Sequence, residues 1–205
     1  MQTLVLPASQ PEAIKRALDL LRRGELVAFP TDTVYGLAAD VHNPQAIERL
    51  FLAKERAASK AIAVLVGSAQ ALAQVALHMP ETAKRLAAAF WPGPLTVVVE
   101  RHPDLPQNLS PLPTIGVRMP DHPIALALLN AAGPLAVTSA NISNAANTAS
   151  AQAVLEQLGG RIGLILDGGQ TPGGTPSTVV DCTQPELKIL RIGPISAEDI
   201  ARVIN

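Results

Sequence analysis

The stretch ELVAFPTDTVYGL, residues 25–37, joins a mainly apolar run to a run rich in polar residues. The apolar run ELVAF is typical of a buried strand. The following PTDTVYGL contains two threonines, an aspartate and the single tyrosine of the chain. Polar groups directly after a buried strand either cap a turn or line a pocket, because strand ends and loops carry the ligands of open sheets. The rest of the chain decides between these interpretations.

Strand-like and helix-like segments alternate on both sides of this stretch. In the segment 11–24, apolar residues recur at Ile14, Ala17, Leu18 and Leu21, the i, i+3, i+4, i+7 spacing of an amphipathic helix. Strands are predicted at 3–6, 25–29, 61–66, 95–100, 115–119, 135–139, 162–166, 177–181 and 187–192. Further helices are predicted at 44–54, 68–78, 81–90, 122–132, 150–159 and 196–204. Alternating elements with some hairpin-like links predict an α/β fold of the α+β type, with a mixed sheet.

Length and composition limit the class of protein. A chain of 205 residues with 48% hydrophobic and 16% charged residues is long enough and apolar enough for one packed core, so we expect a single domain over residues 1–205. The formal net charge of −1 gives no bulk attraction to nucleic acid. Cys182 is the only cysteine, which excludes an internal disulfide and predicts a buried core thiol.

No membrane or export signal is visible in the sequence. The first residues lack a basic segment followed by a long apolar stretch, and no run reaches the roughly 18 apolar residues of a membrane span. We therefore expect no membrane contact and a cytoplasmic location.

Polar residues gather just after several of the predicted strands. PTDTVYG follows ELVAF, Arg118 lies in IGVRMP, the segment TSAN ends PLAVTSAN, and GGQTPGGTPS follows IGLILD. Because strand ends meet at the edge of a sheet, these segments would form a cleft rich in hydroxyls around one arginine.

A fifth segment, AKERAASK at 53–60, carries Lys54, Arg56 and Lys60 at the end of a predicted helix. Three cations on a short loop suit a polyphosphate, because arginine binds oxygens bidentately and lysine adds a mobile charge. The alternative is a solvated basic helix end that the helix dipole favours.

Several common site types are excluded or disfavoured. DGGQTPGGTPS lacks the lysine of a phosphate-binding P-loop and the spacing of a dinucleotide loop. The four histidines are scattered without carboxylate partners, so no metal site is expected. No nucleophile motif surrounds Ser139, which argues against covalent catalysis.

Six motifs occur in one order: PTDTVYGL, Lys54-x-Arg56, WPGPLT, GVRMP, Ser139-x-Asn141 and PSTVVD. With them, the chain resembles the YrdC/TsaC family of L-threonylcarbamoyladenylate synthases, from about residue 10 to residue 195. The resemblance implies a YrdC-like domain with a twisted mixed sheet, flanking helices and a large concave cleft. It also implies an activity that joins L-threonine, bicarbonate and ATP into threonylcarbamoyl-AMP and releases pyrophosphate. A separate transferase complex then passes the threonylcarbamoyl group to tRNA.

The resemblance also implies roles for individual residues. Lys54 and Arg56 would be the catalytic cations. The residues implied for L-threonine are Thr33, Arg118, Thr138 and Ser177. The residues implied for ATP are Arg56, Lys60, Thr114, Ser139, Ala140 through its backbone, Asn141, Thr148 and Arg191.

Attack of a carbamate oxygen on the α-phosphate needs no enzyme nucleophile. It needs two anions brought together and the developing negative charge stabilised. We expect Mg²⁺ to arrive bound mainly by phosphate oxygens and water rather than by side chains. Asp32 is the nearest candidate carboxylate, or it only caps the turn, and Tyr35 is expected to pack with its hydroxyl on a local partner.

Two features depart from the family pattern. Ala57 stands where proline often follows the KxR arginine, and Lys60-Ala61-Ile62 stands where Pro-Leu is usual, so we expect a less rigid loop with its charges kept. The chain ends at Asn205, which resembles the short single-domain form without an extra C-terminal domain.

Two alternatives to the synthase stay open. One is a ribosome-maturation module that binds tRNA or double-stranded RNA through the cationic cleft, but such a module has no need for hydroxyls around Arg118. The other is a paralogue of the same fold without synthase activity.

Overall fold

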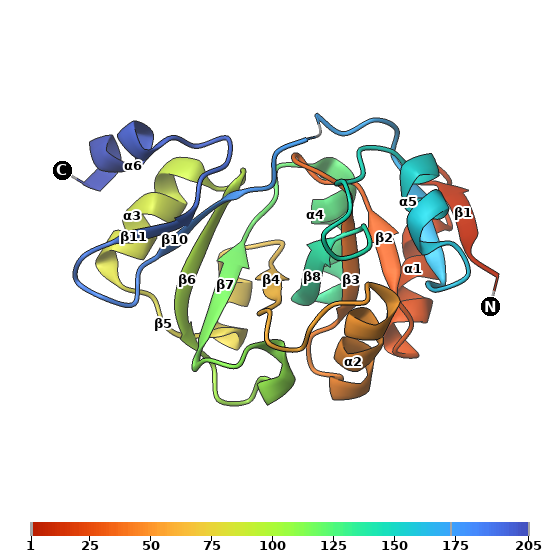
Figure 1. The fold of residues 1–205 in the computed structure, drawn as a ribbon, viewed down its shortest axis with the longest axis horizontal. Helices are drawn as coiled ribbons and strands as arrows, with labels where there is room; N and C mark the ends of the chain where they lie inside the picture. Colours follow the sequence, from red (N-terminus) through yellow and green to blue (C-terminus); the bar gives the residue numbers. More distant parts are fainter. Residues whose placement is uncertain (1, 173, 205) are drawn as a thin grey trace.

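The computed structural model describes residues 2–172 and 174–204, and a mixed sheet runs through this part of the chain (Figure 1). Its strands are β1 (Leu4–Pro7), β2 (Val27–Phe29), β3 (Gly36–Asp40), β4 (Ala63–Leu65), β5 (Ala76–His78), β6 (Leu95–Arg101), β7 (Thr114–Arg118), β8 (Leu135–Ser139), β9 (Leu164–Asp167), β10 (Thr178–Asp181) and β11 (Lys188–Arg191). They lie in the order β1-β9-β2-β3-β8-β4-β7-β6-β10-β11, with β5 paired to β6 beside this path.

Parallel and antiparallel pairs are mixed along the sheet. β9 pairs parallel with β1 and β2, whereas β3 pairs antiparallel with β2 and β8. β10 and β11 form the antiparallel pair predicted from their short link. The prediction of an α/β fold with a mixed sheet is therefore confirmed.

Helices cover the sheet on both faces. They are α1 (Ala13–Arg22), α2 (Pro44–Ala53), α3 (Glu81–Phe90), α4 (Pro123–Ala132), α5 (Ala151–Leu158) and α6 (Ala197–Ile204), with 3₁₀ turns η1 (Gln70–Gln74) and η2 (Gln107–Leu109). Asn43 starts α2 by accepting hydrogen bonds from the backbone N–H groups of Gln45 and Ala46, and Ser150 starts α5 in the same way. None of the helices in residues 2–172 and 174–204 is long and apolar enough to cross a membrane.

Burial on both faces explains why β2 (Val27–Phe29) is apolar at every position. Val27 and Phe29 pack in a core with α1 and α4, while Ala28 between them packs in a second, larger core. Because successive side chains of a strand point to opposite faces, a strand covered on both sides must be apolar at every position.

Two predicted elements differ from the structure. The segment 68–78, predicted as one helix, forms the short turn η1 and then β5, which pairs antiparallel with β6. The η1 residues bury no side chain, so pairing with β6 outweighs the weak helical pattern. Strand β3, with the sequence GLAAD, was not predicted because glycine and alanine are poor strand formers; it is stabilised by partners on both sides.

The strand ends named from the sequence converge. The turn between β2 and β3, the residues at the ends of β7 and β8, and the segment before β10 all reach one cavity. The neighbouring strands β8, β4, β7, β6 and β10 bring these segments together although they lie far apart in sequence.

Candidate functional site

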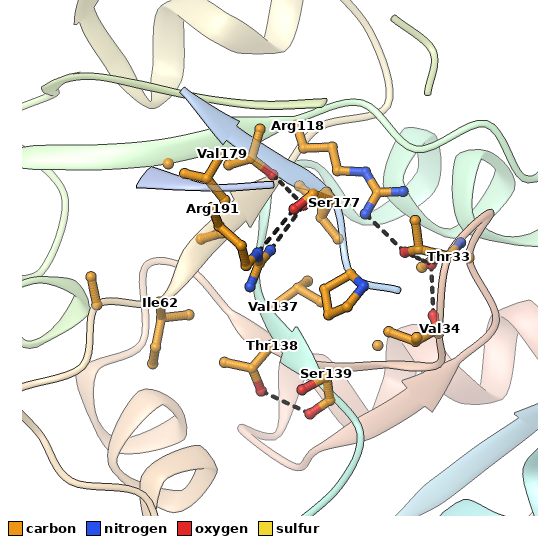
Figure 2. A pocket seen from close by; sticks show the side chains of 18 of the residues that line it. Thr33, Val34, Ile62, Arg118, Val137, Thr138, Ser139, Ser177, Val179 and Arg191 are labelled. Atoms are coloured by element: carbon orange, nitrogen blue, oxygen red, sulfur yellow. Dashed lines mark hydrogen bonds between the residues drawn. The ribbon is translucent and has the colours of Figure 1, made fainter. Parts of the chain in front are cut away.

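The cavity has a volume of about 390 Å³ and is open to solvent on one side. Of the residues predicted for the site, those on its wall are Thr33, Arg56, Arg118, Thr138, Ser139, Ser177 and Arg191. In Figure 2 the side chains of Arg118 and Arg191 lie on either side of Ser177. Residues of PTDTVYGL therefore line a pocket, and they form a turn between β2 and β3.

Arg118 is the most enclosed charge of the site, with 6% of its surface exposed. Its Nε donates to the carbonyl oxygen of Gly93 at 3.0 Å, and its Nη1 donates to Thr33 Oγ1 at 3.0 Å. Its Nη2 forms an ion pair with Asp32 Oδ1. Burial lowers the pKa of Arg118, and the charge of Asp32 opposes that shift. These contacts fix a charged guanidinium at one end of the cavity.

Asp32 therefore does more than cap a turn. Its carboxylate is the counter-ion of Arg118, and its second oxygen, Oδ2, is buried without a hydrogen-bond partner in the described residues. Because one carboxylate already pairs with Arg118, this end of the cavity is close to neutral. A ligand carrying both an anionic and a cationic group fits such an environment better than a polyanion does.

Ser177 and Arg191 form a second polar group. Arg191 Nε donates to the backbone oxygen of Ser177 at 2.9 Å, and Arg191 Nη2 donates to Ser177 Oγ at 3.2 Å. Thr96 Oγ1 lies 2.8 Å from Ser177 Oγ. Strand β11 thus positions its arginine on the segment that leads into β10.

Arg56 completes the cationic part of the wall. Its Nη2 donates to the carbonyl oxygen of Ala61 at 2.8 Å, whereas its Nε is buried without a partner in the described residues. Burial lowers the pKa of Arg56, and the nearby charge of Arg191 lowers it further. No aspartate or glutamate is among the described residues on the wall, so Arg56 and Arg191 create an anion site there.

Lys54 is not among the residues on the wall of the cavity, and its predicted catalytic role stays a prediction. It is 1% exposed, and its Nζ donates to the backbone oxygens of Ser139 and Asn141. Burial lowers the pKa of Lys54 to about 7, and the charge of Arg56 adds to this shift. Lys54 therefore holds the loop that follows β8, and it reaches the site through Ser139.

The remaining predicted ATP residues lie around that loop or away from it. The backbone N–H of Ala140 donates to the carbonyl oxygen of Tyr35, and its carbonyl accepts from Thr148 Oγ1. Asn141 Nδ2 donates to the carbonyl oxygens of Ile142 and Ala145. These three residues close the loop on itself, so the structure does not bring them to the wall of the cavity.

Lys60 and Thr114 also lie outside the wall of the cavity. Lys60 Nζ donates to Asn144 Oδ1 at 3.0 Å and thereby links two loops beside the opening. Thr114 begins β7, opposite Glu100 of β6, whereas Arg118 ends the same strand. Because Thr114 and Arg118 lie at opposite ends of β7, their side chains cannot reach the same end of the cavity.

Lys54 is buried and Arg56 lines the cavity, and the turn that ends α2 lies between these two residues. Glu55 has a left-handed backbone with φ of 52°, its N–H donates to the Leu52 carbonyl, and the Arg56 N–H donates to the Phe51 carbonyl. These two bonds form a Schellman motif, in which the chain reverses at the residue after the cap. Arg161 holds Glu55 through an ion pair of 2.7 Å.

Some residues of the wall were not predicted. Thr31 and Thr96 line the cavity and hydrogen-bond to Thr33 and Ser177, respectively. Both threonines lie within stretches that the sequence singled out, PTDTVYGL and WPGPLT, so proximity to a motif was the available signal. The hydroxyl of Tyr35 donates to the Gly169 carbonyl at 2.8 Å, as expected of a packing residue with a local partner.

The apolar part of the wall comes from alternate residues of the strands and from the loop before β4. Its larger members from these segments are Ile62, Leu65, Val98, Val137, Val179 and Leu190. In the described residues, no group of three histidine, cysteine, aspartate or glutamate side chains is arranged to hold a metal ion. The site thus combines an apolar floor, hydroxyls and arginines.

Fold and site together define an α/β protein with a cleft of the size of a small molecule. In this cleft Arg118 is paired with Asp32, whereas Arg56 and Arg191 have no carboxylate partner among the described residues. A family model described as "Sua5_yciO_yrdC: Telomere recombination" matches residues 19–193. The chain belongs to the Sua5/YciO/YrdC family.

Relatives and solved structures agree with this membership. The chain is 40% identical, over 97% of its length and 92% of the relative, to a putative threonylcarbamoyl-AMP synthase of Mycobacterium tuberculosis. It is similar to the crystal structure of Pyrococcus abyssi Sua5 complexed with L-threonine, with a TM-score of 0.94, 40% identity, and coverage of 100% of this chain and 61% of that one. It is also similar to Escherichia coli YciO, with a TM-score of 0.85, 26% identity, and coverage of 97% and 98%. The chain thus spans about three-fifths of the Pyrococcus structure and nearly all of the other two proteins.

Proposed function

We propose that the protein is an L-threonylcarbamoyladenylate synthase, a nucleotidyltransferase that condenses L-threonine, bicarbonate and ATP to threonylcarbamoyl-AMP and pyrophosphate. Support comes from the threonylcarbamoyl-AMP synthases among its relatives and from the Pyrococcus structure that contains L-threonine. We also infer that the chain acts as one domain, because a single sheet connects the described residues from β1 to β11.

One observation carries the proposal: the cavity has two electrostatically different parts. Near Arg118 the charge is balanced by Asp32, which suits a zwitterionic amino acid. Near Arg56 and Arg191 the charge is unbalanced, which suits a polyphosphate. An enzyme that joins an amino acid to a nucleotide needs both parts within one cavity.

The proposed reaction needs binding and charge stabilisation rather than an enzyme nucleophile. The amine of L-threonine and bicarbonate form a carbamate, and water is released. A carbamate oxygen then forms a bond to the α-phosphorus of ATP, while the bond from that phosphorus to the bridging oxygen breaks and pyrophosphate leaves. Arg56 and Arg191 stabilise the charge that develops on the phosphoryl oxygens and on pyrophosphate. Mg²⁺ enters as part of the nucleotide substrate, since the described wall offers no carboxylate to hold it.

In this proposal Lys54 supports the site from behind the wall, whereas the family resemblance implies a catalytic cation. Because its amine is bound to two backbone carbonyls, it supports the loop that presents Ser139 to the nucleotide. The product would pass to a separate transferase complex that modifies tRNA, and such a role implies a cytoplasmic protein.

Pyrophosphate release by the purified protein tests the proposal. With Mg²⁺ and ATP present, release should require L-threonine and bicarbonate together, and neither alone should suffice. Arg56→Met should abolish the release, whereas Arg161→Met, which removes an exposed arginine away from the cavity wall, should retain it. Release that proceeds without L-threonine would contradict the proposal.

The RNA-binding alternative is not favoured. Its phosphate backbone would need arginines and lysines spread over an open surface, whereas the arginines here converge on a cavity that is lined in part by strand side chains. Weak RNA binding that disappears with salt, in a protein that releases pyrophosphate, would leave the synthase as its function.

A further inference from the structure

Two nearly buried threonines of the cavity wall each contact one of the two hydroxyls that we propose for the amino acid. Thr31 is 3% exposed and contacts Thr33, while Thr96 is 5% exposed and contacts Ser177. A hydroxyl can donate one hydrogen bond and accept two, so its direction toward a ligand depends on its other partners. In each pair, the other hydrogen-bond partners determine which hydroxyl donates and which accepts.

The direction of the Thr33 hydroxyl is fixed by Thr31. Thr31 Oγ1 lies 2.6 Å from the carbonyl oxygen of Val34, which can only accept, so the one proton of Thr31 is used there. Across the 3.1 Å contact between the two hydroxyls, Thr33 must therefore donate and Thr31 must accept. Thr33 Oγ1 also accepts from Arg118 Nη1 at 3.0 Å. What remains on Thr33 is a single lone pair, which can only accept.

The direction of the Ser177 hydroxyl is the opposite. Ser177 Oγ accepts from Arg191 Nη2 at 3.2 Å. Within the described residues the hydroxyl of Thr96 bonds to Ser177 Oγ and to no other group, at 2.8 Å. If Thr96 accepted this bond, its own proton would have no acceptor among the described residues, which is costly for a residue that is only 5% exposed. Thr96 therefore donates, both lone pairs of Ser177 are used, and the proton of Ser177 remains free for a ligand.

We propose that Thr31 and Thr96 are positioning residues that fix the hydrogen-bond direction of Thr33 and Ser177, so that Thr33 only accepts from the amino acid and Ser177 only donates to it. An N–H or O–H group of the substrate then lies against Thr33, and a carboxylate or carbonyl oxygen lies against Ser177. A ligand with these two groups exchanged would bring two donors together at Ser177 and two acceptors together at Thr33. The pair of buried hydroxyls thus selects the orientation of the amino acid. This inference rests on the proposed function, because it takes L-threonine as the ligand.

The test compares binding of L-threonine and of ATP by titration calorimetry. Thr31→Val removes the acceptor for Thr33 at nearly constant volume, and Thr96→Val removes the donor to Ser177. Each should weaken L-threonine binding by about fivefold to tenfold, the effect of one hydrogen bond, and leave ATP binding unchanged. Thr31→Ser and Thr96→Ser keep the hydroxyls and should restore the affinity. In turnover, the KM for L-threonine should rise while kcat stays the same.

Controls separate a positioning role from a loss of stability. Thr3→Val removes a hydrogen bond of 2.7 Å to the Ile162 carbonyl, away from the cavity wall, and should lower the melting temperature without changing L-threonine affinity. If Thr31→Val or Thr96→Val does not fold, the corresponding alanine variant removes the same hydroxyl without adding a methyl group.

The outcomes distinguish this inference from the proposed function. If the unmodified protein does not bind L-threonine, the proposed function fails. If it binds L-threonine and the folded variants without the hydroxyls bind equally well, the positioning role is overturned and the proposed function stands.

Discussion

Arg118 is nearly buried and has three fixed partners. Its contacts with Gly93, Thr33 and Asp32 hold the guanidinium at the end of the cavity that we propose for the amino acid. A preorganised charge of this kind binds a carboxylate with little loss of conformational entropy.

Arg118→Met should therefore weaken L-threonine binding by about 100-fold, since a hydrogen bond to a charged group contributes up to about 3 kcal/mol. ATP binding should change much less. Because this substitution leaves Asp32 without its counter-ion, Asp32→Asn/Arg118→Met is the better-folded reference. Titration calorimetry measures both affinities, and equal losses for the two ligands would reject the assignment of Arg118 to the carboxylate.

Lys54 gives a prediction about stability and pH. Its pKa is lowered to about 7 in the folded protein from 10.5 in the unfolded chain, chiefly by burial. Between these values the unfolded state binds more protons than the folded state, so this residue makes the free energy of unfolding rise with pH from about 7 to 10.5.

Lys54→Met should remove that rise. Urea unfolding at several pH values, for the unmodified protein and the variant, measures the difference and cancels the contributions of other groups. Lys60→Met, at an exposed lysine bonded to Asn144, is the matched control and should leave the pH dependence as it was. A slope that is the same with and without Lys54 would show that its amine is not desolvated.

The motifs located most of the wall, but they could not show side-chain direction. Thr33, Arg118 and Ser177 follow strands whose ends meet, so their convergence was predictable. The burial of Lys54 was not, because it depends on a left-handed residue after α2 and the sequence has glutamate there instead of the usual glycine. Thr96 gave no signal of its own, since one more threonine in a strand is ordinary.

At the scale of elements, the end of α2 decides which cation faces the cavity. Glu55 adopts the left-handed conformation that favours glycine, and this turn separates the buried Lys54 from Arg56 on the cavity wall. Its ion pair with Arg161 is exposed and contributes little to stability.

Glu55→Gly should therefore fold at least as well as the unmodified protein, because relief of backbone strain offsets loss of the ion pair. Glu55→Val should cost about 1–2 kcal/mol, since a branched side chain is disfavoured in this conformation. Chemical denaturation measures both, and Arg161→Met isolates the ion pair. Equal stability of the glycine and valine variants would mean that the Schellman turn does not determine the end of α2.

The element predictions succeeded where a periodic pattern was strong. Helix α1 and strand β9 have clear patterns, and the structure has both. Strand β3 has the sequence GLAAD, which favours no strand, and it forms because β2 and β8 pair with it on either side. The strand depends on pairing with other segments, one of them distant in sequence, so a short stretch of sequence cannot predict it.

At the scale of the whole molecule, charge is distributed unevenly. The formal net charge is −1, yet three arginines face one cavity whose described wall contains no carboxylate. A local cationic site in a nearly neutral molecule attracts a small polyanion without attracting nucleic acid over the whole surface.

This distribution predicts how salt affects the two ligands. ATP binding should weaken steadily as salt is added, because screening reduces attraction between charges. L-Threonine is a zwitterion facing a balanced ion pair, so its binding should change little. Calorimetric titrations over a salt series make the comparison. Equal salt dependence for both ligands would argue that they meet the same electrostatic environment.

The most direct measurement is the mass of the nucleotide product formed from ATP, Mg²⁺, L-threonine and isotopically labelled bicarbonate. Our account predicts threonylcarbamoyl-AMP that carries the label in its carbamoyl carbon, formed together with pyrophosphate and lost in Arg56→Met. A folded protein that binds both L-threonine and ATP yet forms no such adenylate, or forms one without the label, would contradict it.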